Sequence, residues 1–529
     1  MDNVRLLEIQ KEAIKKFWKT GNLLVVLPTG TGKTVVALTI IQQFVNKLHD
    51  KFKCLIVVPA NLRTNITQNI DKFKFRFNAQ IIKNVQQFLD SYESNNVFVV
   101  SYNFLRLHPE LFVDKQWDLL ICDELHYAKN IATKNYKTLF YVRANSKHML
   151  GLTASPVANT PEEFFNIVAL IANDRSLITL GKNLVKYGYE PGVKPPLWAR
   201  ILFGAKPKPG KKIPIGFTDP EAFKRLFSPY VYIPDEYKVQ QTGKRPDIKS
   251  YVINIELTKF ETKAYKYALK QLSPVDLWEL KTGSISSSKL REIKNKIMAA
   301  QQTLLSPDYI YKVNIDKDIE RLKVTLSQFR PGSKIKVTAE RLKQSGNKSI
   351  VYTSFVTFGA RLANLYFNSV GIKSAEYSGH IKPEERQKIV DSFEHGDLQV
   401  ICLTGAGQEG INLPSCKDIY FLNLPWHEEA LRQVIGRALR VTSKNPYVNV
   451  YWVFATINNG KETIDHWMSK IIQRKALMRN IIFNLLKEDI AANVTAALPG
   501  IETYEPVGYK SKKNKLYKKL PLLNPYPER

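Results

Sequence analysis

The feature that most constrains this fold is a glycine-rich loop set between an apolar run and a helical pattern. The apolar run is Leu23–Leu27, and the helical pattern covers Thr34–Leu48. Between them, glycines can let consecutive backbone N–H groups wrap phosphates, and the helix N-terminus adds a positive dipole. Lys33 can supply a point charge to the β- and γ-phosphates, and the Thr34 hydroxyl can ligate magnesium. The sequence therefore predicts ATP and Mg²⁺ as cofactors, with the phosphates held by Pro28, Thr29, Gly30, Thr31, Gly32, Lys33 and Thr34.

Short apolar runs alternate with amphipathic stretches in two separate parts of the chain, which is typical of parallel α/β sheets. The expected buried strands are Leu23–Leu27, Cys54–Val58, Val97–Val100 and Leu119–Cys122, and later Ser349–Tyr352, Val400–Leu403, Asp418–Phe421 and Val448–Val453. Helices are expected at Gly359–Val370 and Glu384–Glu394, the second directly after Pro383. The predicted fold class is α/β, with two tandem recombinase-like P-loop NTPase lobes and a helical insertion or connector.

Composition shifts divide the chain into five expected segments. Residues 1–180 form an ATP-binding lobe, and 181–240 form a basic Pro/Gly-rich loop with the end of that lobe. Residues 241–335 form the helical insertion or connector, and 336–480 form the second lobe. Residues 481–529 form a basic C-terminal extension, expected to be partly disordered.

An acidic pair follows the strand expected at Leu119–Cys122. Asp123 stands where a carboxylate can hold magnesium, and Glu124 can orient and deprotonate an attacking water. An acidic pair can also merely end a strand. The separation from the phosphate loop and the following His126 favour the functional interpretation.

Lys and Arg outnumber Asp and Glu by 78 to 48, a formal charge of +30. Such an excess favours a polyanionic partner, because fixed cations release counterions condensed on phosphate backbones. A Lys-rich coding bias would give the same excess without a binding role. The basic candidates for binding are Lys206–Lys212 and Lys510–Lys519. A solvated loop for the first and a solubilising or import-like tail for the second are equally open interpretations.

The four cysteines are widely spaced and lie mostly in apolar runs: Cys54, Cys122, Cys402 and Cys416. Neither a metal site nor a disulfide framework is expected, so they are predicted to be buried thiols in a reducing compartment. No run approaches 18 apolar residues, and the N-terminus lacks the pattern of a signal peptide. We therefore expect an intracellular protein with no membrane partner.

Nine segments in order resemble the conserved motifs of superfamily 2 helicases, and within them of the SWI/SNF group, over nearly all of residues 5–480. The segments that carry the resemblance are Gln10, Pro28–Thr34, Val57–Leu62, Ser101–Tyr102, Asp123–Asn130, Leu152–Pro156, Val351–Ser354, Thr404–Leu413 and Gln433–Arg440. The phosphate loop, Ser228–Tyr232 and Glu409–Ile411 depart from chromatin remodellers. In these features the chain looks closer to the nucleoside triphosphatase I and early-transcription-factor small-subunit groups of poxviruses and related cytoplasmic DNA elements.

The resemblance assigns roles to further residues. It implies that Gln10 reads adenine and that Gly410 belongs to the nucleotide site. It implies coupling of hydrolysis to nucleic-acid contact by His126, Thr153 and Ser155. The nucleic-acid contacts that it implies are Pro59, Ala60, Ser101, Tyr102, Ser354 and Thr404.

The segment Gln433–Arg440 matches the pattern Gln-x-x-Gly-Arg-x-x-Arg. Arg437 and Arg440 lie one turn apart on the expected helix, so both can face one cleft. The resemblance implies that Arg440 is an arginine finger reaching the γ-phosphate from the opposite lobe, with Arg437 beside it. Hydrolysis would then depend on lobe closure. The expected catalytic residues are Glu124, Lys33, Gln433, Arg437 and Arg440.

The function favoured by the sequence is an ATP-driven motor that translocates on nucleic acid, with DNA preferred over RNA, in the service of transcription. An RNA polymerase or another transcription protein is a candidate partner, and the sequence leaves the oligomeric state open. One alternative is a helicase that separates DNA or RNA strands, and another is a non-enzymatic basic scaffold with a relict ATP fold. The viral resemblance favours a cytoplasmic viral factory or the virion, with the nucleus as the alternative location.

Overall fold

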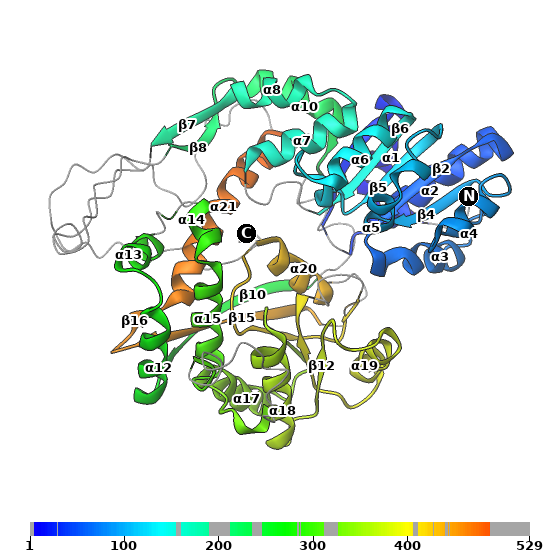
Figure 1. Cartoon of the computed structure of the whole chain (residues 1–529). Coiled ribbons are helices and arrows are strands. Elements are labelled where there is room, and N and C mark those ends of the chain that lie inside the picture. Colours follow the sequence, from blue (N-terminus) through cyan, green and yellow to red (C-terminus); the bar gives the residue numbers. More distant parts are fainter. Residues whose placement is uncertain are drawn as a thin grey trace. The chain divides into compact units, whose positions relative to one another are not determined.

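The structure is a computed structural model that divides into two compact units (Figure 1). It describes residues 5–486 except 29, 155–159, 190–211, 235–245, 283–284, 286, 311–325, 406–410, 427, 440–442 and 444. Unit 1 comprises Met1–Tyr187, Pro214–Lys244 and Lys475–Ala496, and unit 2 comprises Gly188–Ile213, Arg245–Arg474 and Ala497–Arg529. Among the helices described, none is long and apolar enough to cross a membrane.

Unit 1 is built on a parallel sheet with the strand order β3-β4-β2-β5-β6-β1-β9. Its strands are β1 (Asn22–Val26), β2 (Cys54–Val58), β3 (Gln80–Ile81), β4 (Val97–Ser101), β5 (Trp117–Asp123), β6 (Ser146–Thr153) and β9 (Val231–Tyr232). Its helices are α1 (Glu8–Thr20), α2 (Lys33–Leu48), α3 (Arg63–Lys72), α4 (Val85–Ser91), α5 (Tyr102–Leu107), α6 (Lys134–Ala144), α7 (Pro161–Ala172), α8 (Ser176–Leu184) and α10 (Pro220–Phe227). A separate two-stranded sheet pairs β7 (Val185–Tyr189) with β8 (Lys212–Phe217).

Alternate residues of the strands in unit 1 enter two different hydrophobic cores. Leu23 and Val25 of β1 pack in a core with Ile9 of α1 and Ile40 of α2. Leu24 packs instead in a core that includes residues of α5, α6 and α7. The strands read as continuous apolar runs because both faces of this parallel sheet are covered by helices.

Unit 2 contains the second parallel sheet, with the order β10-β15-β14-β11-β13-β12 and a short antiparallel strand, β16, on β15. Its strands are β10 (Asp247–Glu256), β11 (Ser349–Tyr352), β12 (Ser374–Tyr377), β13 (Val400–Leu403), β14 (Asp418–Phe421), β15 (Tyr447–Ile457) and β16 (Lys461–Glu462). Its helices are α12 (Lys259–Leu269), α13 (Pro274–Thr282), α14 (Ser287–Glu292), α15 (Lys294–Leu305), α17 (Ser333–Ser345), α18 (Leu362–Ser369), α19 (Pro383–His395) and α20 (Glu428–Ala438), while α21 (Ile464–Leu486) begins in unit 2 and ends in unit 1.

The fold class predicted from the sequence is confirmed by these two parallel sheets. The boundaries expected for Cys54–Val58, Ser349–Tyr352, Val400–Leu403 and Asp418–Phe421 agree with those of β2, β11, β13 and β14. The prediction that the four cysteines are buried thiols is also confirmed, since all four are free and buried. Burial raises the pKa of Cys54, Cys122, Cys402 and Cys416, so the thiols stay protonated near neutral pH.

The segment 241–335 is expected from the sequence to be a helical insertion or connector, but its described residues lie in unit 2, where they are built into the second lobe. Its strand β10 pairs in parallel with β15 along its whole length, from Asp247↔Tyr447 to Glu256↔Thr456. Residues of α12 and α15 share a hydrophobic core with the second sheet. A search for continuous apolar runs misses this strand, because its residues alternate between more and less exposed positions, a pattern that is itself typical of a half-buried strand.

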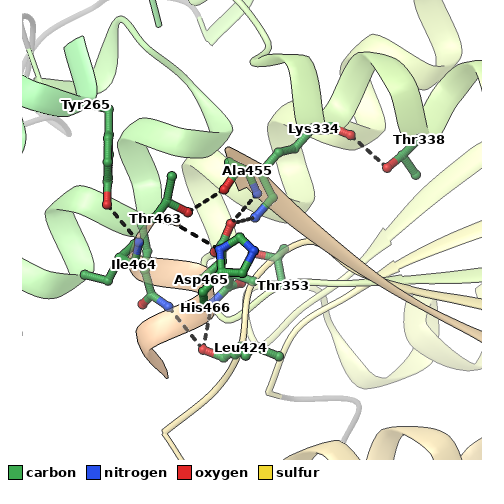
Figure 2. A network of polar contacts seen from close by, with 12 residues as sticks. Tyr265, Lys334, Thr338, Thr353, Leu424, Ala455, Thr463, Ile464, Asp465 and His466 are labelled. Carbon is green, nitrogen blue, oxygen red and sulfur yellow. Dashed lines mark hydrogen bonds and ion pairs between the residues drawn. The ribbon is translucent and has the colours of Figure 1, made fainter. Parts of the chain in front are cut away.

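A buried polar network fixes the beginning of α21 inside unit 2 (Figure 2). The Lys334 ammonium lies 2.7 Å from Asp465 Oδ2, and the two side chains are 0% and 1% exposed. The same oxygen accepts from the backbone N–H of Ala455 at 2.9 Å. The Ile464 N–H donates to the Tyr265 hydroxyl oxygen at 2.8 Å. The start of α21 is thereby bonded to α17, β15 and α12.

Candidate active site

The carboxyl ends of three neighbouring strands bring most of the expected catalytic residues of unit 1 together. In the sheet, β6 lies between β5 and β1, with Asp123 opposite Leu152 and Val26 opposite Thr153. The Leu27 N–H continues this ladder by donating to the Thr153 carbonyl at 3.1 Å. The phosphate loop, the acidic pair and the segment after β6 therefore leave the sheet at the same edge, which is where ligands bind in open α/β sheets.

The phosphate loop has the backbone conformation that its glycines permit. Gly30 and Gly32 have φ values of +77° and +79°, in the left-handed region that side chains disfavour. Gly32 is the N-cap of α2, so the loop leads directly into the positive end of that helix. The Thr31 side chain turns back within the loop, where its hydroxyl donates to the Pro28 carbonyl at 2.7 Å. Loop and helix thus form a cradle suited to anionic oxygens.

Gln10 is bonded to the phosphate loop itself. Its side chain is 4% exposed, and its Nε2 donates to the Thr31 carbonyl at 2.8 Å while its Oε1 accepts from the Leu7 N–H at 2.9 Å. A Cβ on Gly32 would lie 2.5 Å from Gln10 Nε2. Gln10 therefore supports the phosphate loop through its bond to Thr31 and its close approach to Gly32. Its expected role in recognising adenine stays a prediction.

Lys33 is the first residue of α2, and its ammonium donates to the Leu27 carbonyl at 3.2 Å. Thr34, one residue further along α2, is half-buried. The residues of this edge fit a nucleotide with a divalent cation. The loop supplies N–H donors and the lysine a positive charge, while Asp123 and the Thr34 hydroxyl supply the oxygen ligands that Mg²⁺ prefers.

The acidic pair ends β5 with an unusual backbone conformation. Glu124 has φ +51° and ψ +50°, a left-handed conformation that costs a non-glycine residue about 1–2 kcal/mol. Asp123 Oδ1 accepts the Glu124 N–H at 3.0 Å, and each of the two residues is 8% exposed. Strain of this kind is maintained where the surrounding structure over-determines it, and it clusters at functional sites.

His126 links the acidic pair to the end of β6. Its Nδ1 lies 3.3 Å from Glu124 Oε2 and 3.5 Å from Thr153 Oγ1. Thr153 is fully buried beside the strand that leads into the phosphate loop. The structure therefore brings Glu124, His126 and Thr153 into one connected group, although their role in coupling remains a prediction.

Several residues expected to touch nucleic acid are buried. Ser101 and Tyr102 are each 5% exposed, and Pro59 is also buried, whereas the neighbouring Ala60 is exposed. Ser101 Oγ caps α5 by accepting from the Phe104 N–H at 3.1 Å. The Tyr102 hydroxyl donates to the Asp123 carbonyl at 2.8 Å. Both side chains are thus used inside unit 1, and a nucleic-acid contact at 101–102 would have to use the backbone.

In unit 2, Gln433 and Arg437 lie on α20 and are 5% and 8% exposed. Arg437 Nη1 donates to the Ile411 carbonyl at 3.1 Å, and the Leu413 N–H donates to the Arg437 carbonyl at 3.0 Å. The helix and the segment around residue 411 are therefore joined through Arg437. This contact gives Arg437 a positioning role within the unit beside the catalytic role expected for it.

The other two contacts expected in unit 2 differ in exposure. Ser354 is exposed, and its N–H donates to Asn423 Oδ1 at 2.8 Å. Thr404 is 3% exposed, and its N–H donates to the Tyr377 carbonyl at 3.2 Å. Asn423 follows β14 and also accepts from the Thr353 hydroxyl at 2.9 Å, a link that no sequence signal indicated. Thr29, Ser155, Gly410 and Arg440, with both expected basic segments except Lys212, lie outside the described residues.

An exposed row of lysines on α12 is a further basic surface, which no sequence signal singled out. Lys259, Lys263, Lys266 and Lys270 are all exposed, and none of their ammonium groups has a hydrogen-bond or ion-pair partner among the described residues. Their spacing places them along one helix face, while Ala264, Tyr265 and Ala268 on the opposite face are buried. The row spans about 16 Å at about 1.5 Å per residue.

Three family descriptions match successive parts of the chain. Residues 3–158 match the type III restriction enzyme res subunit, and residues 333–442 match the helicase conserved C-terminal domain. Residues 439–512 match the nucleoside triphosphatase I C-terminal family. Each description covers less than half of the chain, and together they cover both lobes.

Full-length relatives are similar over most of the chain. An uncharacterized ATP-dependent helicase, YqhH of Bacillus subtilis, is 26% identical over 89% of this chain and 77% of its own. Nucleoside triphosphatase I of Choristoneura biennis entomopoxvirus is 24% identical over 88% of this chain and 75% of its own. A putative ATP-dependent RNA helicase, L538 of Acanthamoeba polyphaga mimivirus, is 21% identical over 91% of this chain and 96% of its own.

Among solved structures, the Sulfolobus solfataricus SWI2/SNF2 ATPase core in complex with dsDNA is 17% identical over 91% of this chain and 94% of that one. The TM-score of 0.39 is too low to support a conclusion about this chain.

Proposed function

This chain is a superfamily 2 helicase that resembles viral nucleoside triphosphatase I, and from that premise we propose that it converts ATP hydrolysis into translocation on DNA. It is an ATP-hydrolysing enzyme of the helicase type.

The observation that carries the proposal is the adjacency of β5, β6 and β1 in the first sheet. This order brings a phosphate cradle, an acidic pair and the Thr153–His126 contact to one edge. A chain that kept the fold without the activity would have no need to retain a left-handed Glu124 beside that cradle.

Within this proposal, each residue of unit 1 has a stated task. The backbone N–H groups of the loop and the Lys33 ammonium bind the phosphates of ATP, and Gln10 keeps the loop in shape. Asp123 and Thr34 would hold Mg²⁺, and a cation bound there would supply charge that stabilises the phosphates. Glu124 orients the attacking water and accepts its proton, with His126 alongside it at 3.3 Å.

For unit 2 we propose that Arg440 reaches the γ-phosphate when the lobes close and that Arg437 and Gln433 lie beside it. A group of this kind can raise the rate by about 10³–10⁵. The bond from Arg437 to the Ile411 carbonyl supports this assignment, because it fixes the end of α20 from which Arg440 follows.

DNA is proposed as the track because of the formal charge of +30 and the unpaired lysine row on α12. The sequence resemblance to viral transcription ATPases motivates our further proposal that the chain works beside an RNA polymerase or another transcription protein. It also favours a cytoplasmic viral setting.

The decisive experiment measures ATP hydrolysis with duplex DNA, single-stranded DNA and RNA in parallel. We expect DNA to stimulate turnover strongly, and we expect Lys33→Ala and Arg440→Ala to abolish the stimulated rate. Exposed Lys382→Ala serves as a control for each alanine variant. Equal turnover in all four proteins would remove the proposed mechanism.

A strand-separating helicase is the second candidate, favoured by the names of two relatives as ATP-dependent helicases. A forked duplex and a triplex distinguish the two activities. Displacement of the third strand without release of the forked strand supports translocation, whereas release of the forked strand supports unwinding. Stimulation by RNA alone would favour an RNA helicase.

A further inference from the structure

Tyr102 makes a contact inside unit 1 to which the proposed function gives no task. It is the first residue of α5, directly after β4, and its side chain is 5% exposed. Its hydroxyl donates to the main-chain carbonyl of Asp123, at the end of β5, at 2.8 Å. Since β2 lies between β4 and β5 in the sheet, the bond joins two strand ends that are about 10 Å apart.

The Asp123 carbonyl belongs to the peptide that carries the chain from β5 into the left-handed turn at Glu124. The orientation of this peptide sets the direction from which both acidic side chains leave the backbone. The bond from Tyr102 holds the carbonyl oxygen, and the bond from the Glu124 N–H holds Asp123 Oδ1. Loss of the Tyr102 hydroxyl would therefore first alter the orientation of the Asp123 and Glu124 side chains.

The aromatic ring of Tyr102 supports the other end of the same turn. It stacks on the ring of Tyr127 with centroids 5.2 Å apart and planes at 17°. The Tyr127 N–H in turn donates to the Glu124 carbonyl at 3.1 Å. One side chain thus contacts the segment 123–127 both before and after the strained residue.

In this contact the phenol is the donor. A main-chain carbonyl oxygen can only accept, so the Tyr102 hydroxyl and the Asp123 carbonyl are complementary.

We propose that Tyr102 is a positioning residue for ATP hydrolysis, which sets the orientation of Asp123 and Glu124 through the Asp123 carbonyl and the Tyr127 ring. The inference rests on the proposed function, because it gives the acidic pair its catalytic task. The family resemblance assigns residues 101–102 to nucleic-acid contact. Under this proposal, the same strand end also supports the turn that carries the two carboxylates.

The test compares Tyr102→Phe with Tyr136→Phe. Phe at position 102 keeps the stacked ring and removes only the hydroxyl. Tyr136 on α6 is the matched control, since it is 1% exposed, belongs to the same hydrophobic core, and its hydroxyl has no hydrogen-bond partner among the described residues. Both variants lose the same atom from the same unit, but only one loses a hydrogen bond.

For Tyr102→Phe we expect kcat to fall about tenfold, as loss of one buried hydrogen bond predicts, with KM for ATP unchanged. We expect the Mg²⁺ concentration for half-maximal rate to rise, because Asp123 is the proposed ligand. Amide hydrogen exchange should quicken in a peptide covering 119–128 and nowhere else in unit 1. Tyr136→Phe should match the wild type in all three measurements, and Tyr127→Leu should quicken exchange at 124–128 with a smaller fall in kcat.

The proposal is overturned if Tyr102→Phe exchanges like the wild type at 119–128. It is also overturned if kcat at saturating nucleic acid is unchanged and only the apparent affinity for nucleic acid falls, since Tyr102 would then serve the track. If the wild type itself hydrolyses no ATP, the proposed function fails, and the exchange measurement still decides whether the hydroxyl holds the turn.

Discussion

The acidic pair of unit 1 and the Lys334–Asp465 pair of unit 2 are both buried charges, but they are built in opposite ways. Lys334 and Asp465 neutralise each other at 2.7 Å and are 0% and 1% exposed. Asp123 and Glu124 have like charges on consecutive residues, are 8% exposed and leave the end of a parallel strand through a left-handed turn. The Lys334–Asp465 pair is neutral as a whole and is held by bonds to Asp465 Oδ2, whereas the Asp123–Glu124 pair lies at the edge of the sheet where ligands bind.

The difference shows that burial of charge alone does not indicate catalysis. A buried pair of opposite charges can fix the register of the elements that carry it. Two like charges on adjacent residues of a strained turn repel each other, so they indicate a functional role, such as binding a cation beside a reacting phosphate. Substitutions in the Asp123–Glu124 pair should therefore lower the rate of ATP hydrolysis, whereas substitutions in the Lys334–Asp465 pair should lower the free energy of unfolding.

The largest effect is expected for Glu124→Gln. This substitution keeps the shape and removes the proposed base, so the rate of ATP hydrolysis should fall by about 10²–10⁴. The free energy of unfolding should stay the same or rise, because one of two adjacent buried negative charges is gone. Steady-state hydrolysis and urea unfolding measure the two quantities. A large loss of stability with activity retained would show that Glu124 serves the fold rather than catalysis.

The next effect is expected for Lys334→Met, which leaves Asp465 buried and without its counter-charge. Breaking a buried pair in this way costs about 3–5 kcal/mol of unfolding free energy. Unfolding followed at Trp452 or Trp467, both buried in unit 2, should show this loss.

A double variant, Lys334→Met with Asp465→Asn, is the control for that loss. The Asn side-chain oxygen can still accept the Ala455 N–H, which now lies 2.9 Å from Asp465, while both charges are removed. We expect most of the lost stability to return, with a coupling energy of at least about 1 kcal/mol between the two sites. Additive losses would mean that the ion pair itself does not hold the start of α21.

A smaller effect is expected from pH, through His466 beside Asp465. Burial lowers the pKa of His466 below its ordinary value of 6.5, against the opposing effect of Asp465 and Glu462, and Lys334 and Lys470 lower it further. The unfolded chain therefore binds a proton at a higher pH than the folded chain does. This stability is present above about pH 6.5 and is lost as the pH falls through the folded-state pKa.

Urea unfolding of the wild type and of His466→Gln between pH 5 and pH 8 measures this dependence. The variant should lose the part of the pH dependence that lies below pH 6.5. Parallel curves for the two proteins would show that another group is responsible.

The smallest effect is expected from substitutions in the α12 lysine row, which should change only the salt dependence of DNA binding. Replacing Lys259, Lys263, Lys266 and Lys270 by Gln should lower the salt dependence of DNA binding by about 0.9 for each phosphate that the protein no longer neutralises. The matched control replaces four other exposed lysines of unit 2, Lys336, Lys343, Lys382 and Lys388, which changes the net charge equally. An equal salt slope in both variants would make the row a solvated surface.

Some of the site could be predicted because local sequence carries its chemistry. The glycines at 30 and 32 are needed for positive φ, and Lys33 and Thr34 must follow at the start of a helix. The task of Tyr102 could not be predicted in this way. Its partner is the Asp123 carbonyl, 21 residues away, and a backbone atom leaves no mark in the sequence.

The sequence by itself determined two parallel α/β lobes and a phosphate loop at the end of a buried strand, because apolar runs and glycine positions act over a few residues. Only the tertiary structure decided that β10 belongs to the second sheet and that Lys334 meets Asp465. It also decided that a tyrosine after β4 supports the acidic end of β5. The physical reason is distance along the chain, since such contacts depend on which strands become neighbours and on which buried atoms then need a partner.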